Sequence, residues 1–155
     1  MKITAIGADI SKNDVSCSTS LVNNVEKNLF KLTELGASHS ALTNVTGDDI
    51  VVSAFVEDDL VETINEAIVN ILIDCAENLG DLSGISDNES EAGEGISYAE
   101  AKFRPGYYPD AIILGFDTYG GEPFVADVAN SAINAVAEKI TLPGNTLQGV
   151  PLSTK

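Results

Sequence analysis

The sequence predicts an α+β domain, a two-layer sandwich of about six mostly antiparallel strands against three helices. Three stretches carry the same apolar pattern, each just downstream of a predicted strand, and they begin at Leu21, Leu60 and Phe124. Apolar residues occupy the first, second, fifth, ninth and twelfth positions of each stretch, which is the spacing of one helix face. A chain of 155 residues suits one domain with a single core, so we expect residues 1–155 to form one unit.

The recurrence of this pattern also predicts a threefold ββα pseudo-repeat. Its units cover roughly residues 1–36, 37–80 and 96–141. Residues 81–95 are acidic and glycine-rich, and we expect a loop there because such a stretch is too polar to bury. Residues 142–155 are expected to form an irregular C-terminal arm.

The first unit is predicted to be a hairpin followed by a helix. Lys2–Ala8 is apolar enough for a strand, and Val15–Thr19 alternates with a period of two. The helix should begin near Leu21 or Val22 and end at Gly36, since glycine readily adopts the left-handed conformation that ends helices. Its candidate N-cap residues are Ser20 and Asn23.

The second unit has the clearest pattern in the chain. Ala41–Thr46 and Ile50–Phe55 are rich in β-branched residues and flank a short polar turn at 47–49. A helix is predicted from Asp59 or Leu60 to Leu79, with Gly80 as its stop.

The apolar face of this second helix is unusually wide. Val69 and Ile73 fall outside its main face and extend the apolar arc to roughly 240°. One sheet cannot cover such an arc, so we expect a homo-oligomer, with a trimer or hexamer favoured. The alternative is that loops of the same chain cover the helix.

The third unit is predicted to contain strands at Ile96–Phe103 and Ala111–Phe116, joined by residues 104–109, and then the helix that begins at Phe124. Compared with the second unit, it carries about three extra residues between strand and helix, within residues 117–123. Insertions at such a junction are common places for functional sites.

These two connections supply the candidate ligand site. Two glycines before a predicted helix free the backbone to approach an anion, and a helix N-terminus attracts negative charge. Arg104 is the only arginine in the chain, and a guanidinium binds carboxylate or phosphate through two hydrogen bonds. If the two loops meet, they form a pocket for a small anionic or planar metabolite. The predicted ligand-binding residues are Arg104, Tyr107, Tyr108, Tyr119, Gly120 and Gly121.

Catalytic residues are indicated less strongly. If they converge, Asp117 and Glu122 could act as a carboxylate pair in acid–base chemistry or bind Mg²⁺, although an acid after a strand more often caps the next helix. His39 lies among serines without a nucleophile motif and is interpreted as an exposed loop residue. No metal site and no cofactor is indicated, because the histidines and cysteines are too few for a zinc site.

Charge and cysteine content restrict the function classes. The formal net charge of −16 repels phosphate backbones and anionic membrane surfaces, so we expect neither nucleic acid nor membrane as a partner. No apolar run is long enough to span a bilayer. Cys17 and Cys75 are assigned to buried faces, and without a CxxC pair or an apolar leader the sequence favours a reduced, cytoplasmic protein.

The segment VSAFVEDDLVETINEAI at residues 52–68 resembles a strand and helix of PII-type signalling proteins. The resemblance implies a ferredoxin-like trimer that binds nucleotides and small anions in clefts between subunits. The long loop that this family uses for partners is missing between Thr46 and Ile50, and none of the family's binding residues transfers. The resemblance therefore supports a strand–helix trimer without assigning the chain to that family.

Two functions follow from the sequence. The first is a homo-oligomer that binds a small metabolite near residues 104–109 and 117–122, with its status as an enzyme left open. The second is a structural, self-assembling protein without a catalytic site, whose acidic exterior and wide apolar helix serve packing.

Overall fold

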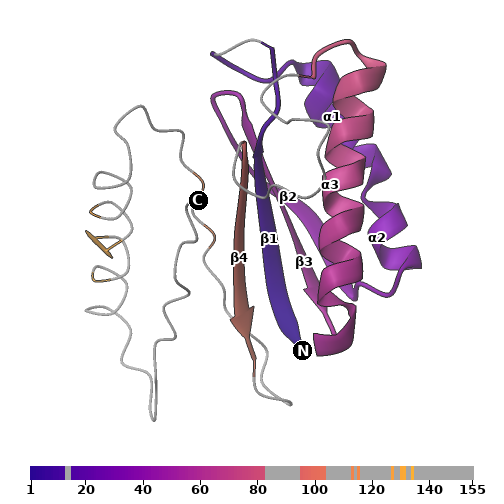
Figure 1. Cartoon of the computed structure of the whole chain (residues 1–155), viewed down its shortest axis with the longest axis vertical. Coiled ribbons are helices and arrows are strands. Elements are labelled where there is room, and N and C mark those ends of the chain that lie inside the picture. The colour runs from indigo at the N-terminus through magenta and orange to yellow at the C-terminus, as the bar shows by residue number, and fades with distance from the viewer. Residues whose placement is uncertain are drawn as a thin grey trace.

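The computed structural model describes residues 1–12, 15–82 and 95–103, together with six single residues farther along the chain. These six are Ile113, Gly115, Asp127, Asn130, Ser131 and Asn134. The elements in chain order (Figure 1) are β1 (Lys2–Asp9), α1 (Thr19–Asn28), α2 (Phe30–Glu34), β2 (His39–Thr46), β3 (Asp49–Val56), a 3₁₀ turn (Asp58–Leu60), α3 (Val61–Asn78) and β4 (Ile96–Lys102).

The four strands form one antiparallel sheet in the order β2-β3-β1-β4. Strand β1 is central: Ile6 lies opposite Val52 of β3 on one side and opposite Tyr98 of β4 on the other. The chain order is βαββαβ, and β3 lies between β1 and β2, which is the ferredoxin-like arrangement. The predicted α+β class is therefore confirmed, and the topology is the one implied by the resemblance of residues 52–68.

The helices cover one face of the sheet (Figure 1). Even-numbered residues of β1 and β3, such as Ile6 and Val52, belong to a buried cluster with Leu21 of α1 and with Ile64 and Ile68 of α3. Alternate strand residues point to one face, so the register places all of these side chains in the layer between sheet and helices.

Helix α3 has neighbours in its own chain along its wide apolar arc. Helices α1 and α2 both pack against it, and the Asn28 amide of α1 lies 3.7 Å from the Cys75 sulfur. Val69 is partly buried and packs against the core, and Ile73 is also partly buried. Other elements of the same chain therefore cover much of the apolar arc of α3. The predicted homo-oligomer stays a prediction.

The first predicted unit is wrong in one element. Val15–Thr19 is not a strand, because both edges of β1 are already paired with β3 and β4. Instead, the Cys17 amide donates to the Gly47 carbonyl at 2.9 Å. Ser18, rather than Ser20 or Asn23, caps α1 by accepting the Leu21 amide at 3.1 Å.

The single helix predicted between Leu21 and Gly36 is divided at Leu29 into α1 and α2, and the rest of the first two units agrees with prediction. The helical region from Thr19 ends at Gly36, whose φ of 107° is left-handed. Strands β2 and β3 form the predicted hairpin around Gly47, and α3 lies within two residues of its predicted bounds. The sequence did not indicate the β-bulge between Leu42 and Asn44, which shifts the β2 register.

Only part of the third predicted unit lies within the described residues. Strand β4 is confirmed. Of the predicted strand Ala111–Phe116, only Ile113 and Gly115 are described, and neither is assigned to a strand. Asp127, Asn130, Ser131 and Asn134 are helical, as the third apolar stretch predicts.

The predicted total of six strands and the threefold ββα repeat are not confirmed. The described elements instead form two βαβ units, β1–α1–β2 and β3–α3–β4.

Both ends of the acidic segment 81–95 contact the end of β1. The Lys12 amide donates to the Asp81 carbonyl at 3.0 Å, and the Asp9 amide donates to the Gly95 carbonyl at 2.8 Å. Residues 83–94 and the predicted arm at 142–155 lie outside the described residues. Among the described residues, no helix has the length and apolar character needed to cross a membrane.

Truncating the Ile68 side chain should destabilise the fold strongly. Ile68 is fully buried between α3 and the sheet, so Ile68→Ala should lower the free energy of unfolding by about 2–5 kcal/mol. The control is Leu79→Ala at the end of α3, where the side chain is 45% exposed and the change should stay within about 0.5 kcal/mol. Urea unfolding measures both, and equal losses would contradict this description of the core.

Candidate functional site

The residues of the predicted ligand site lie outside the described part of the chain. This applies to both loops and to the candidate carboxylate pair. The residues concerned are Arg104, Tyr107, Tyr108, Asp117, Tyr119, Gly120, Gly121 and Glu122.

The described residues that flank the two loops lie at different ends of the sheet. Phe103, which precedes the first loop, donates its amide to the Met1 carbonyl at 3.1 Å. Gly115, which precedes the second, accepts the Thr46 hydroxyl at 3.3 Å and lies against Val51, the partner of Gly7. Five residues of β1 separate Lys2 from Gly7, a distance of about 17 Å. The two loops could share one pocket only if the chain between them spanned this distance. The shared pocket stays a prediction.

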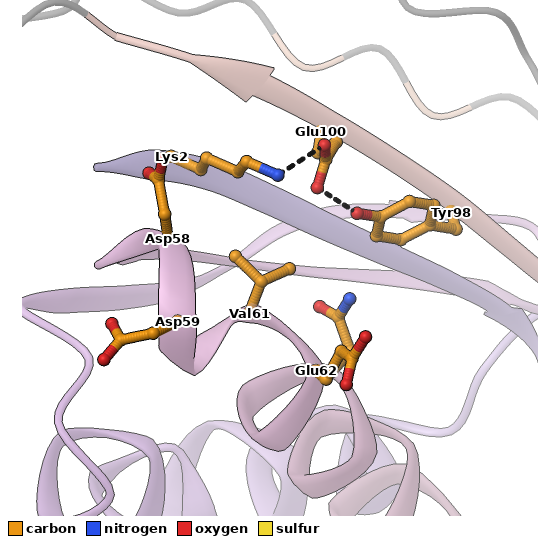
Figure 2. A pocket seen from close by; sticks show the side chains of 8 residues that line it. Lys2, Asp58, Asp59, Val61, Glu62, Tyr98 and Glu100 are labelled. Atoms are coloured by element: carbon orange, nitrogen blue, oxygen red, sulfur yellow. Dashed lines mark hydrogen bonds and ion pairs between the residues drawn. The ribbon is translucent and has the colours of Figure 1, made fainter.

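A pocket of about 570 Å³ lies within the described residues, between the start of α3 and strands β1 and β4 (Figure 2). Alternate residues of β4 point their side chains toward α3, because the strand has a period of two. The first turn of α3 and the preceding 3₁₀ turn supply the opposite wall. The lining residues are Lys2, Asp58, Asp59, Val61, Glu62, Asn65, Tyr98 and Glu100.

One wall of the pocket is a hydrogen-bonded network. The Lys2 amine donates to one oxygen of Glu100 at 2.7 Å, and the Tyr98 hydroxyl donates to the other oxygen (Figure 2). Beneath them, the Thr4 hydroxyl, fully buried in β1, donates to the Asn65 side-chain oxygen of α3 at 2.7 Å. The network fixes the side chains of this wall before any ligand arrives.

The network perturbs the acid–base properties of its members. Burial raises the pKa of Tyr98 to about 12, and the hydrogen bond to Glu100 adds to the effect. The Lys2 amine, followed by the Tyr98 hydroxyl, lowers the pKa of Glu100. At neutral pH the wall therefore holds a neutral phenol and a carboxylate.

The cations at the rim of the pocket are already paired. Asp58 accepts the Met1 amine at 2.7 Å and the Lys102 amine at 2.7 Å. These hydrogen bonds, the one from Lys102 first, lower the pKa of Asp58 to about 2. Because Lys2 is paired with Glu100 in the same way, none of these positive charges is left over for an anionic ligand.

Two carboxylates of the pocket have no ion-pair partner among the described residues. Asp59 and Glu62 stand at the start of α3 and line the cavity. The pocket therefore presents unneutralised negative charge beside fixed polar groups. Such a surface suits an amine or another cationic group. Within the described ranges, no three His, Cys, Asp or Glu side chains are arranged to hold a metal ion.

This pocket is hard to predict from the sequence. Strand β4 was predicted, but its pairing with β1 joins residues almost a hundred positions apart, such as Lys2 and Glu100. The available signal was the alternation of Tyr98, Glu100 and Lys102 on one face of a strand. Polar residues on the helix-facing side of a sheet need partners.

The remaining candidate side chains show no catalytic arrangement. His39 is exposed, as predicted, but it lies in β2 rather than in a loop, with its ring 6.5 Å from that of Phe55. Both cysteines are free; Cys75 is buried and Cys17 is partly buried. Burial raises the pKa of Cys17 to about 12, so its side chain is a thiol and not a nucleophilic thiolate at neutral pH.

Comparison with known proteins assigns the chain to a family. Residues 2–150 match the family Uncharacterised conserved protein UCP005278. The chain belongs to this family. An uncharacterized protein of Methanothermobacter thermautotrophicus is 65% identical over 135 residues, which are 87% of this chain and 55% of that protein.

Uncharacterized protein MJ1676 of Methanocaldococcus jannaschii is 46% identical over 128 residues, which are 82% of this chain and 53% of that protein. The chain thus spans about half the length of the curated relatives that it matches.

Replacing Glu100 should shift the titration of Tyr98. Glu100→Gln removes the carboxylate that helps to raise the Tyr98 pKa, so the phenolate should form at a lower pH than in the parent protein. Stability contributed by the protonated phenol is complete below the unfolded pKa near 10 and is lost as the pH rises toward the folded value of about 12.

Near-ultraviolet absorbance follows phenolate formation. The chain has four tyrosines, so a Tyr98→Phe variant identifies the contribution of Tyr98. Glu66→Gln, which removes an exposed charge elsewhere on α3, should leave the titration unchanged. An unchanged titration in Glu100→Gln would show that the carboxylate and phenol are not in contact.

Proposed function

We propose that this protein binds a small amine-bearing metabolite in the pocket between α3 and β4. The observation that carries the proposal is the charge of the lining: two of its four carboxylates, Asp59 and Glu62, have no ion-pair partner among the described residues, whereas Lys2 is already paired with Glu100. A volume of about 570 Å³ falls within the range of roughly 300–1,000 Å³ that is common for small-molecule pockets.

The fixed hydrogen-bonded network would make ligand binding more specific than charge alone could. Asn65 and the Tyr98–Glu100 pair offer hydrogen-bonding atoms at defined positions on one wall, while Asp59 and Glu62 offer charge on the other. An ammonium or guanidinium group would pair with one of these carboxylates, and the polar part of the ligand would face the network. The proposal leaves open whether the bound metabolite reacts.

The predicted site for an anionic or planar ligand at residues 104–109 and 117–122 stays a second proposal. It rests on Arg104, the only arginine of the chain, and on the paired glycines at 120 and 121. Because the flanking residues Phe103 and Gly115 lie at different ends of the sheet, the two loops would more readily form separate sites than a single one.

A homo-oligomer, as a trimer or hexamer, remains part of the proposal, and a structural protein without a catalytic site remains the alternative. The observation that favours association is on α2 and its end, where Phe30 is 56% exposed and Leu35 is 45% exposed. Each of these side chains is available for a contact between copies of the chain.

Amine binding can be tested by thermal stabilisation with putrescine and agmatine as cationic probes and with citrate and adenosine monophosphate as anionic ones. An amine at a hundred times its dissociation constant should stabilise the fold by about 2.7 kcal/mol, or raise the melting temperature by about 5–10 °C. The double variant Asp59→Asn, Glu62→Gln should lose this shift because its pocket lacks both free carboxylates.

The matched control is Glu66→Gln, one turn farther along α3 and exposed, which should keep the full shift. Equal stabilisation of the parent and the double variant by the amines would contradict the proposal. Stabilisation by the anions alone would instead favour the site around Arg104, and Arg104→Ala would then abolish it.

Light scattering tests association separately. We expect a trimer or hexamer for the parent chain and smaller particles for Phe30→Asp, because a charge at an apolar contact carries a desolvation penalty. A strictly monomeric parent chain at micromolar concentration would exclude the oligomer. Large particles or filaments would favour the structural alternative.

A further inference from the structure

The two pocket carboxylates that have no ion-pair partner among the described residues stand apart from each other. Asp59 belongs to the 3₁₀ turn and Glu62 to the first turn of α3, and Figure 2 shows their side chains on opposite sides of Val61. A separation of three residues corresponds to a rise of about 4.5–6 Å along the helix. An ammonium group holds a carboxylate oxygen at about 2.7–2.9 Å, so one such group placed on Asp59 leaves Glu62 without a partner.

The charges of the lining lead to the same conclusion. The Lys2 amine pairs with Glu100 at 2.7 Å, and both residues line the pocket. The Lys102 amine pairs with Asp58 at 2.7 Å. The other two carboxylates of the lining therefore leave two negative charges in the pocket. A ligand with one positive charge would neutralise only one of them, whereas a ligand with two separated positive charges would neutralise both.

The part of the pocket between these two carboxylates is apolar. Val61 lines it and is only 6% exposed, and Figure 2 shows its side chain directed toward the strands. The methylene stem of Lys2 also lines the pocket, because its amine reaches across to Glu100. A hydrocarbon spacer placed here would be removed from water against apolar surface.

We propose that the ligand of this pocket is a linear aliphatic diamine, with one ammonium group on Asp59, the other on Glu62 and the hydrocarbon spacer over Val61. This inference rests on the proposed amine pocket, and it adds the number and the spacing of the positive charges. A monoamine of the same length would make one of the two ion pairs. A compact dication such as Mg²⁺ would carry both charges at one point and would not span the two carboxylates.

The test compares putrescine with butylamine, which has the same four-carbon chain but a single ammonium group, on the full 155-residue chain. The nuclear magnetic resonance signal of the Asn65 side-chain amide, in the wall of the pocket, follows the titration. Both carboxylates are exposed, so the second ion pair has the modest strength of a surface contact. Putrescine should therefore bind about fivefold more tightly than butylamine.

Single variants separate the two contacts. Asp59→Asn and Glu62→Gln should each remove the advantage of putrescine, while butylamine, which can use either carboxylate, should lose little affinity. Both substitutions keep the size of an exposed side chain, so the variants should fold like the parent chain. The matched control is Glu66→Gln, which removes an exposed charge elsewhere on α3 and should keep the full advantage of putrescine.

Each other outcome has a distinct meaning. Equal affinities for putrescine and butylamine, both lost in the double variant Asp59→Asn, Glu62→Gln, would overturn the diamine and leave the amine pocket intact. An advantage of putrescine that persists in both single variants would come from the field of a chain with a net charge of −16, and it would also overturn the diamine. The absence of binding by either amine would refute the amine pocket and the diamine together.

Discussion

The burial of β1 on both of its faces is the constraint on which the rest of the structure depends. This strand is paired on both edges, and its residues from Ile3 to Ala8 are buried. Every side chain it carries therefore needs a partner above or below the sheet. On one face α1 and α3 meet this need with aliphatic side chains. On the other face β1 carries small residues such as Ala5, which is 9% exposed, and the Gly115 backbone lies against Val51 of the neighbouring strand β3.

The pocket results from the way in which the buried side chains of β1 find partners next to β4. Thr4 is the polar residue of β1 that faces the helices and is fully buried, so Asn65 of α3 must satisfy its hydroxyl. Along the same edge, Tyr98 and Glu100 replace the aliphatic residues that β3 provides on the other side of β1. Polar groups that bind one another fill space less completely than interdigitating aliphatic side chains. A cavity with fixed polar walls is the result.

The sequence predicted elements well and their connections poorly. The periodic apolar pattern of α3 and the turn at Gly47 are local signals, and the structure confirms both predictions. The segment Val15–Thr19 alternates like a strand, yet Ser18 and Cys17 are used to cap α1 and to bind the β2–β3 turn. The choice between these states depends on whether β1 has a free edge. Whether β1 has a free edge depends on its pairing with β4, which lies almost a hundred residues away in the sequence. The pocket depends on the same long-range pairing, so it could not be predicted from local patterns.

The acidic composition of the chain bears directly on how an amine would be recognised. A net charge of −16 attracts cations to the whole surface, so the overall field alone cannot single out one site. That diffuse attraction is screened over about 8 Å at physiological salt, whereas hydrogen bonds to partly buried groups are screened much less. Selectivity must therefore come from the combination of Asp59 and Glu62 with the fixed polar wall of Asn65, Tyr98 and Glu100. Because Asp59 and Glu62 are exposed, added salt weakens their attraction for a cation as well. The partly buried wall of Asn65, Tyr98 and Glu100 supplies the part of the selectivity that salt affects least.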